Sequence, residues 1–234
     1  MAIMGVLLDF SGTIFRMESS ESWLRAVLAD ARIPMPEPEL LHHAAQLEAM
    51  GALPGGAPLA VVPDHLAHLW AARDESAEHH RVAYTSLAQQ VALPGTGLHD
   101  ALYERHMTPA AWHPYPDTAE VLTTLNLQGI RVGVLSNIGW DLRPVIRAHG
   151  LDDYVNAYTL SYEHGIQKPD PRLFRIACDS IGVAPHEVLM VGDDRRADGG
   201  AAELGCSVHY VDHLPAAERP LGLMPVLDLI GQQH

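Results

Sequence analysis

The amino-acid sequence predicts an α/β fold, in which a parallel sheet has helices on both faces and a helical insertion follows the first strand. Over residues 112–234, short apolar runs alternate with helical segments, which is the pattern of a parallel sheet. From about Ser19 to Leu102, helix signals are instead separated by breakers such as Leu53-Pro54-Gly55-Gly56. A chain of 234 residues is long enough for a core domain with a smaller insertion.

The first strand is the apolar run at residues 6–8, which ends on a carboxylate, Asp9. The turn that follows contains Ser11, Gly12 and Thr13. A buried strand of this kind delivers Asp9 to the carboxyl edge of the sheet, where ligands bind in open α/β folds. Because Asp and Gly also suit ordinary turns, this stretch alone does not establish a site.

The remaining elements follow from periodicity, capping residues and breakers. Ser19-Ser20-Glu21 signals a helix start, and Asp117 and Asp170 are the expected N-caps of two later helices. Within the insertion, further helices are expected over 38–49, 63–72 and 75–91. The later elements expected, in order, are helix 117–127, strand 130–135, helix 142–149, strand 155–160, helix 170–181, strand 188–191, helix 198–204, strand 208–211 and helix 224–230.

Composition excludes several classes of partner and site. The formal net charge of −14 argues against nucleic acid and anionic membranes, which would repel the chain. No apolar run reaches the length of a membrane span and no basic leader precedes the first strand, so we expect a cytoplasmic protein, monomeric or homodimeric. Cys178 and Cys206 lack CxxC spacing, which argues against a zinc site or a disulfide framework.

Polar groups follow several of the predicted strands and converge on one edge. They are Asp9 with Ser11 and Thr13, Ser136 with Asn137, Lys168 on a loop, and Asp193 with Asp194. Two carboxylates from separate strands repel one another unless a cation lies between them, and their hard oxygen atoms favour Mg²⁺. Lys168, the only lysine of the chain, suits a phosphate or another anion. The edge therefore predicts attack on an anionic substrate by a carboxylate nucleophile.

Four motifs resemble those of the haloacid dehalogenase-like (HAD) hydrolase superfamily. They are D-F-S-G-T at 9–13, V-G-V-L-S-N at 132–137, G-I-Q-K-P-D-P-R-L-F at 165–174 and V-G-D-D-R-R-A-D at 191–198. The resemblance implies a Rossmann-like core over 1–15 and 108–234. It also implies a mobile, all-helical cap domain over 16–107, called the insertion below.

The resemblance also implies roles for individual residues. Asp9 would form an aspartyl-enzyme intermediate, assisted by Ser11 and Lys168. Mg²⁺ would be held by Asp9, the carbonyl of Ser11 and Asp193, with support from Asp194 and Asp198. The small anionic substrate would be bound by Thr13, Arg16, Ser136 and Asn137.

One position departs from the phosphatase pattern. Phosphatases of the superfamily carry an acid-base aspartate two residues after the nucleophile, and Ser11 stands there. L-2-haloacid dehalogenases have an aromatic residue and phosphonoacetaldehyde hydrolases have alanine, but the latter need a cap lysine that this chain lacks. Glu18, His42 and His43 are candidates for the missing acid. Arg16 is expected either to contact the substrate or to form a surface salt bridge.

Three functions therefore remain open. The leading hypothesis is a Mg²⁺-dependent phosphatase acting on a small phosphorylated metabolite through Asp9. The second is a 2-haloacid dehalogenase, which the missing aspartate favours. The third is a catalytically weak, ligand-binding regulatory protein.

Overall fold

The computed structural model describes residues 2–56 and 61–231 of the chain. Its main sheet has the strand order β5-β4-β1-β6-β7, and all neighbouring strands are parallel. The strands are β1 (Gly5–Leu8), β4 (Arg131–Ser136), β5 (Ala157–Leu160), β6 (Val188–Gly192) and β7 (Ser207–Tyr210). Because β1 lies between β4 and β6, Asp9 emerges at the middle of the carboxyl edge.

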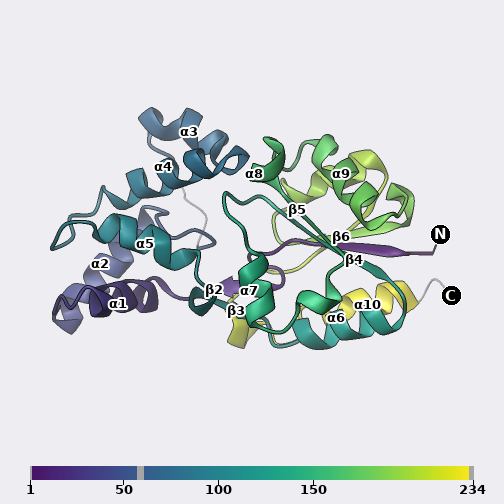
Figure 1. Ribbon diagram of the computed structural model, residues 1–234, viewed down its shortest axis with the longest axis horizontal. Coiled ribbons are helices and arrows are strands. Elements are labelled where there is room, and N and C mark those ends of the chain that lie inside the picture. Colours follow the sequence, from purple (N-terminus) through teal and green to yellow (C-terminus); the bar gives the residue numbers. More distant parts are fainter. Residues whose placement is uncertain (1, 57–60, 232–234) are drawn as a thin grey trace.

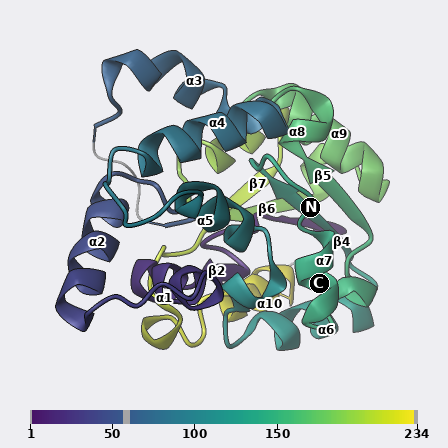
Figure 2. The ribbon, with the colours of Figure 1, turned by 60° about the vertical axis from the view of Figure 1, so that its left-hand side comes forward.

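Helices cover both faces of this sheet, as the sequence predicts (Figures 1 and 2). One face carries α6 (Thr118–Leu127), α7 (Arg143–Ala148) and α10 (Met224–Gly231), and the other α8 (Ser161–His164) and α9 (Pro171–Ile181). The alternation of side chains along β1 explains the two cores. Val6 and Leu8 belong to one buried cluster, whereas Leu7 belongs to the other.

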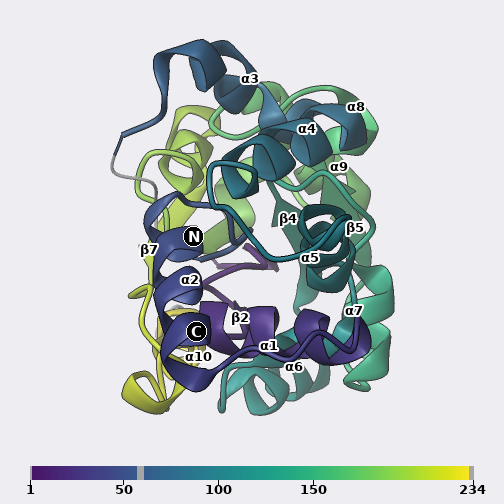
Figure 3. The same ribbon diagram turned by 90° about the vertical axis from the view of Figure 1, so that its left-hand side faces the viewer.

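The helices of the insertion lie beyond the carboxyl edge of the sheet, and both termini lie at its opposite end (Figures 1 and 3). These helices are α1 (Ser20–Asp30), α2 (Glu37–Ala49), α3 (Ala67–Ala71), α4 (Ala77–Ala88) and α5 (Leu98–His106). The start of α1 is the predicted one, since the Ser19 side chain accepts a hydrogen bond from the Ser22 backbone N–H at 3.2 Å. The insertion thus faces the edge at which Asp9 emerges.

Several elements differ from the expected ones. Strands β2 (Phe15–Met17) and β3 (Trp112–Pro114) form an antiparallel pair where the chain leaves and re-enters the core. They were missed because three residues are too few to show an alternation of side chains. The expected helix over 63–72 is divided into a 3-10 turn (Asp64–Leu66) and α3, and the segment Asp198–Leu204 is a 3-10 helix.

The two predicted aspartate caps have different outcomes. Asp170 caps α9, because its carboxylate accepts from the Arg172 N–H at 2.9 Å. Asp117 stands at the N-cap position of α6, as predicted, but its side chain makes no capping hydrogen bond. Its carboxylate instead accepts from the N–H groups of Leu223 and Met224, at 2.6 and 3.1 Å. The start of a helix distant in sequence thus satisfies Oδ2 of this buried carboxylate, whereas Oδ1 has no hydrogen-bond partner among the described residues.

Two predicted absences concern the cysteines and the membrane. Cys178 and Cys206 are both buried and free, with their sulfur atoms 4.0 Å apart. Within the described part of the chain, no helix combines the length and apolar character that a membrane crossing requires.

A buried arginine from the C-terminal region holds the turn after Asp9. Arg219 donates to the carbonyl oxygens of Gly12 (2.6 Å), Thr13 and Asp212 (2.9 Å). Its guanidinium also lies over the Tyr115 ring, 3.2 Å from the centroid. The turn of the first motif is therefore fixed by a charge that the motif does not contain.

Replacing this arginine should destabilise the protein. Arg219→Ala leaves two buried carbonyl groups without their charged donor, so the free energy of unfolding should fall by about 2–3 kcal/mol. Urea denaturation followed by circular dichroism measures this change. The exposed Arg172→Ala is the matched control and should stay within about 0.5 kcal/mol of the wild type. Equal stabilities of the two variants would contradict this role.

Candidate active site

A cavity of about 230 Å³ lies at the carboxyl edge of the sheet, between the core and the insertion. Its wall contains eight of the residues singled out from the sequence: Asp9, Ser11, Ser136, Asn137, Lys168, Asp193, Asp194 and Asp198. Thr13 and Arg16 are not part of this wall. Thr13 is completely buried, and its carbonyl accepts from Arg219. Thr13 thus supports the turn from beneath the cavity.

Lys168 links the carboxylates of this cavity. Its Nζ donates to Asp9 Oδ1 at 2.7 Å, to Asp198 Oδ1 at 2.6 Å and to the Leu135 carbonyl at 3.3 Å. The residue is only 4% exposed. Burial opposes its charge, but Asp198 and Asp9 together raise the pKa of Lys168 above its ordinary value. Lys168 is therefore a charged group held in one position.

The carboxylates around Asp9 bring more negative charge than Lys168 offsets. Burial is the main cause that raises the pKa of Asp9 to about 7, and Lys168 opposes this shift. The carboxylates of Asp198 and Asp193 raise the pKa further. A bound cation would relieve this excess of negative charge.

The loop after β4 positions Lys168 from the other side. Asn137 donates from Nδ2 to the Lys168 carbonyl at 2.9 Å, and its Oδ1 accepts from the Lys168 N–H at 2.6 Å. Both ends of the amide are thus engaged by the backbone of Lys168. Ser136 is buried and contributes to the cavity wall beside it.

The loop after β6 uses its acidic groups in different ways. Both oxygens of Asp198 are engaged, one by Lys168 and one by the Asp194 N–H at 3.0 Å. Asp194 Oδ1 accepts from the N–H groups of Arg196 and Ala197, at 2.8 and 3.0 Å. Asp198 therefore positions Lys168 and the loop.

Some carboxylate oxygen atoms of the cavity could bind Mg²⁺. Asp9 Oδ2 and Asp193 Oδ1 have no hydrogen-bond partner among the described residues. Within the same residues, no group of three or more His, Cys, Asp and Glu side chains is arranged to hold a metal. Mg²⁺ in proteins commonly has one or two carboxylate ligands and several waters. Two carboxylates beside an excess of negative charge fit that requirement.

His213 is a site residue that the sequence analysis missed. Its Nδ1 lies 2.5 Å from Asp193 Oδ2, and its Nε2 contacts the Arg16 guanidinium. Arg16 contacts this histidine and is not in the cavity wall, so the expected surface salt bridge is not found among the described residues, and a contact of Arg16 with the substrate stays a prediction. His213 follows β7 in a segment without regular structure, and no motif marks it.

The insertion closes over Ser11 with a glycine turn. Gly55 has φ +73°, and a Cβ atom there would lie 2.6 Å from Ser11 Oγ and 2.7 Å from Trp112 Cη2. Only glycine allows this approach. Glu18, His42 and His43 are not part of the cavity wall, and Glu18 accepts from Arg105 Nε at 2.7 Å. The structure therefore does not place the three expected acids in the cavity.

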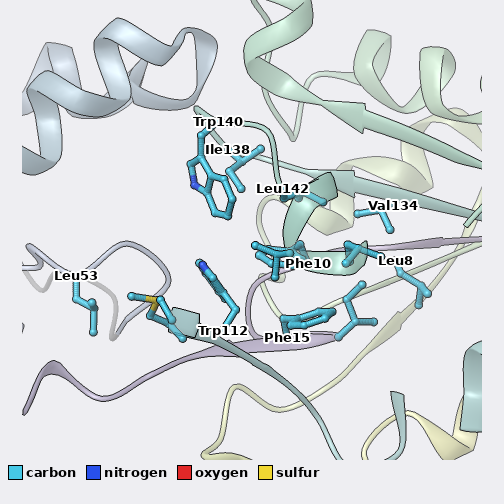
Figure 4. Packing of buried hydrophobic residues seen from close by; sticks show 14 of the residues in the cluster. Leu8, Phe10, Phe15, Leu53, Trp112, Val134, Ile138, Trp140 and Leu142 are labelled. Atoms are coloured by element: carbon cyan, nitrogen blue, oxygen red, sulfur yellow. The ribbon is translucent and has the colours of Figure 1, made fainter. Parts of the chain in front are cut away.

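Aromatic rings form the apolar part of the wall. Trp112 and Trp140 lie 6.0 Å apart between their centroids, and Phe10 packs 4.7 Å from Trp112 behind them (Figure 4). The side of the insertion adds Trp70, Arg73, Asp74, His80 and Tyr84. These residues come from segments in which the sequence shows only helical periodicity.

Comparison with known proteins agrees with this architecture. A family model described as haloacid dehalogenase-like hydrolase matches residues 3–205. The chain is 38% identical over 111 residues to (S)-2-haloacid dehalogenase 4A of Burkholderia cepacia, covering 47% of this chain and 46% of that protein. It is also 38% identical over 108 residues to phosphoserine phosphatase of Thermus thermophilus, covering 45% and 43%. The matches thus span less than half of each of these relatives.

Two solved structures share the fold. The L-2-haloacid dehalogenase from Xanthobacter autotrophicus aligns with a TM-score of 0.64 and 22% identity, covering 97% of this chain and 84% of the other. A HAD phosphatase from Thermococcus onnurineus aligns with a TM-score of 0.56 and 22% identity, covering 90% and 86%.

Proposed function

The chain belongs to the haloacid dehalogenase-like hydrolases, and on that premise we propose that it is a Mg²⁺-dependent phosphatase acting on a small phosphorylated metabolite. The observation that carries this proposal is the position of Asp193 near Asp9, where Lys168 alone does not balance the negative charge. Two carboxylates in one buried site with too few cations favour a bound Mg²⁺.

The proposed reaction begins at Asp9. The Asp9 carboxylate attacks the phosphorus of the substrate, the bond to the leaving oxygen breaks, and the phosphoryl group becomes an acyl phosphate on Asp9, while the leaving alkoxide takes a proton from water. Water then attacks the phosphorus, which restores the carboxylate and releases phosphate. Lys168, fixed 2.7 Å from Asp9 Oδ1, keeps the nucleophile ionised and oriented. Mg²⁺, held by Asp9 and Asp193, would supply Lewis-acid stabilisation of the transferring group.

Ser11 affects which substrates the proposed phosphatase can cleave. A hydroxyl can hold a water molecule but is a poor proton donor, so substrates with good leaving groups should be favoured. Changing Ser11→Asp restores an acid next to Asp9 and should raise kcat for unactivated phosphate esters by about 10²–10⁴.

Steady-state assays with alkyl and nitrophenyl phosphates check this prediction, with Ser11→Ala as the control for simple loss of the hydroxyl. The gain should be larger for the alkyl ester, whose leaving group needs the proton. If Ser11→Asp is no faster than the wild type on either ester, the site is used for different chemistry.

A second function, cleavage of a carbon–halogen bond in a 2-halo acid, is supported by a separate observation. A halide leaves without protonation, so Ser11 would be no handicap. The aromatic wall formed by Trp112 and Trp140 also suits a weakly hydrated halide. The relative from Burkholderia cepacia is named for this activity.

One panel of substrates separates the three hypotheses. Purified protein is assayed with phosphate esters and with 2-halo acids, each with Mg²⁺ and with a chelator, against Asp9→Asn. Phosphate release that requires Mg²⁺ supports the phosphatase, and halide release in chelator supports the dehalogenase. If neither product exceeds the Asp9→Asn background, both enzyme proposals fail and the regulatory reading remains.

A further inference from the structure

A second cavity, of about 320 Å³, adjoins the catalytic one. The two share the residues Trp70, Arg73, Asn137, Lys168, Asp194 and Ala197 in their walls. The second cavity is completed on the core side by Gln167 and Arg196, among others. A molecule whose reacting group lies at Asp9 can therefore extend past Arg73 into this space.

The two cavities differ in charge. Five aspartates line the catalytic cavity, against Arg73 and Lys168. The charged residues in the described wall of the second cavity are Arg73, Lys168 and Arg196, against Asp194 alone. Lys168 directs its ammonium group to Asp9 and Asp198. The remaining basic side chains of this wall are Arg196 and Arg73, of which Arg73 also pairs with Asp74.

Arg73 is held in place by its neighbours, but its Nε–H has no acceptor among the described residues. Its Nη1 donates to the Trp70 carbonyl at 2.9 Å, and its guanidinium lies over the Trp70 ring, 4.3 Å from the centroid. Its Nη2 lies 3.3 Å from Asp74 Oδ2. Its Nε is buried and has no hydrogen-bond partner among the described residues. A buried donor without an acceptor is costly, and an oxyanion would satisfy it.

The segment that carries Arg73 is fixed to the core. Ser161 Oγ donates to the Asp74 carbonyl, and Gln167 Nε2 donates to the Ala71 carbonyl, both at 2.5 Å. These contacts set the position of Arg73 relative to the strands that carry the nucleophile. Binding at Arg73 therefore requires little ordering of the protein, which favours affinity.

We infer that the second cavity binds a distal oxyanion of the substrate, a carboxylate or a second phosphoryl group, through Arg73 and Arg196. The substrate would then be a small phosphate ester with another anionic group a few bonds from the phosphorus. This inference rests on the proposed phosphatase function and narrows its substrate class. Arg73 and Arg196 would serve in binding and leave the chemistry to Asp9.

The test compares two esters of nearly equal size, phosphoglycolate, which ends in a carboxylate, and hydroxyethyl phosphate, which ends in an alcohol. For wild-type protein, kcat/KM should be higher for phosphoglycolate. Arg73→Met should lower that value by about 10–100-fold, mainly through KM, because one charge-assisted hydrogen bond is lost. The loss should be smaller with hydroxyethyl phosphate, which lacks the carboxylate. A bisphosphate ester in place of phosphoglycolate asks whether a phosphoryl group serves equally well.

Two further variants show whether a loss of activity after Arg73→Met arises from the subsite or from misfolding. Arg196 is exposed, so Arg196→Met should fold and should lower the preference for phosphoglycolate in the same direction. Arg195→Met is the matched control, since Arg195 packs over Tyr210 and is not part of the cavity wall. Equal losses on both esters, or no effect of either variant, would overturn the inference.

Calorimetric binding to Asp9→Asn protein separates the two proposals. If phosphoglycolate binds more tightly and Arg73→Met abolishes that preference, the subsite stands even where wild-type protein releases no phosphate. If wild-type protein hydrolyses both esters but binding shows no preference, the subsite fails and the phosphatase stands. If neither ester binds, both proposals are contradicted.

Discussion

Asp9→Asn protein should fold normally and release no phosphate above background, a loss in kcat of about 10⁴-fold or more. The carbonyl oxygen of asparagine can still accept from Lys168 Nζ, which lies 2.7 Å from Asp9 Oδ1. The amide, however, is not a nucleophile and cannot form the acyl phosphate. Initial rates with saturating substrate and Mg²⁺ measure the loss.

The control for this variant is Asp179→Asn, which removes an exposed carboxylate from α9 and should retain wild-type activity. Thermal denaturation of Asp9→Asn shows whether the fold is kept. Residual activity within about tenfold of wild type, in protein free of wild-type contamination, would mean that another group performs the attack.

Lys168→Met should be the most damaging substitution for activity and stability together. It leaves Asp9 and Asp198 buried without their common cation, and breaking a buried ion pair costs about 3–5 kcal/mol. The pKa of Asp9, already raised to about 7 mainly by burial, would rise further and the nucleophile would become protonated. We expect kcat to fall by about 10³-fold, measured beside the free energy of unfolding.

The matched control is the double variant Lys168→Met with Asp198→Asn. Removing one of the two stranded carboxylates should recover part of the lost stability, but no activity, because Asp9 still lacks its cation. Equal stability of the single and double variants would contradict the view that Lys168 offsets both carboxylates. Wild-type kcat in Lys168→Met would contradict its role beside the nucleophile.

Much of the core was predictable because its signals are local. Each strand of the main sheet is a short apolar run, and the parallel order brings Asp9, Lys168 and Asp193 to one edge whatever the loop details. The capping role of Asp170 also follows from its immediate neighbour, Pro171. Predictions of this kind need only the residues within one or two turns.

The parts that were missed depend on contacts between distant segments. Asp117 satisfies the start of α10, more than a hundred residues away, and Arg219 holds the turn of the first motif from near the C-terminus. His213 reaches Asp193 from a segment with no motif. The residues that the insertion contributes to the cavity wall, including Arg73, were missed for the same reason. Side chains that act through tertiary contacts leave no periodic signal in the sequence.

Three features of the two cavities bear on the leaving group and the substrate. The residues around Asp9 belong to motifs that resemble those of the HAD hydrolases, and the relatives of the chain include proteins named as a phosphatase and as a dehalogenase. Ser11, the closely approaching Gly55 and the charged second cavity are features of this chain from which leaving group and substrate can be argued. Specificity is therefore best tested at Ser11 and Arg73, and the reaction type at Asp9.

The central claim is that Asp9 becomes covalently modified during turnover. The most direct measurement is mass spectrometry of the peptide that contains Asp9, from protein quenched in acid early in the reaction with the best phosphate ester and Mg²⁺. We predict a phosphoryl group on that peptide in wild-type protein and none in Asp9→Asn. Repeated turnover with an unmodified Asp9 peptide, or with the phosphoryl group on another residue, would contradict it.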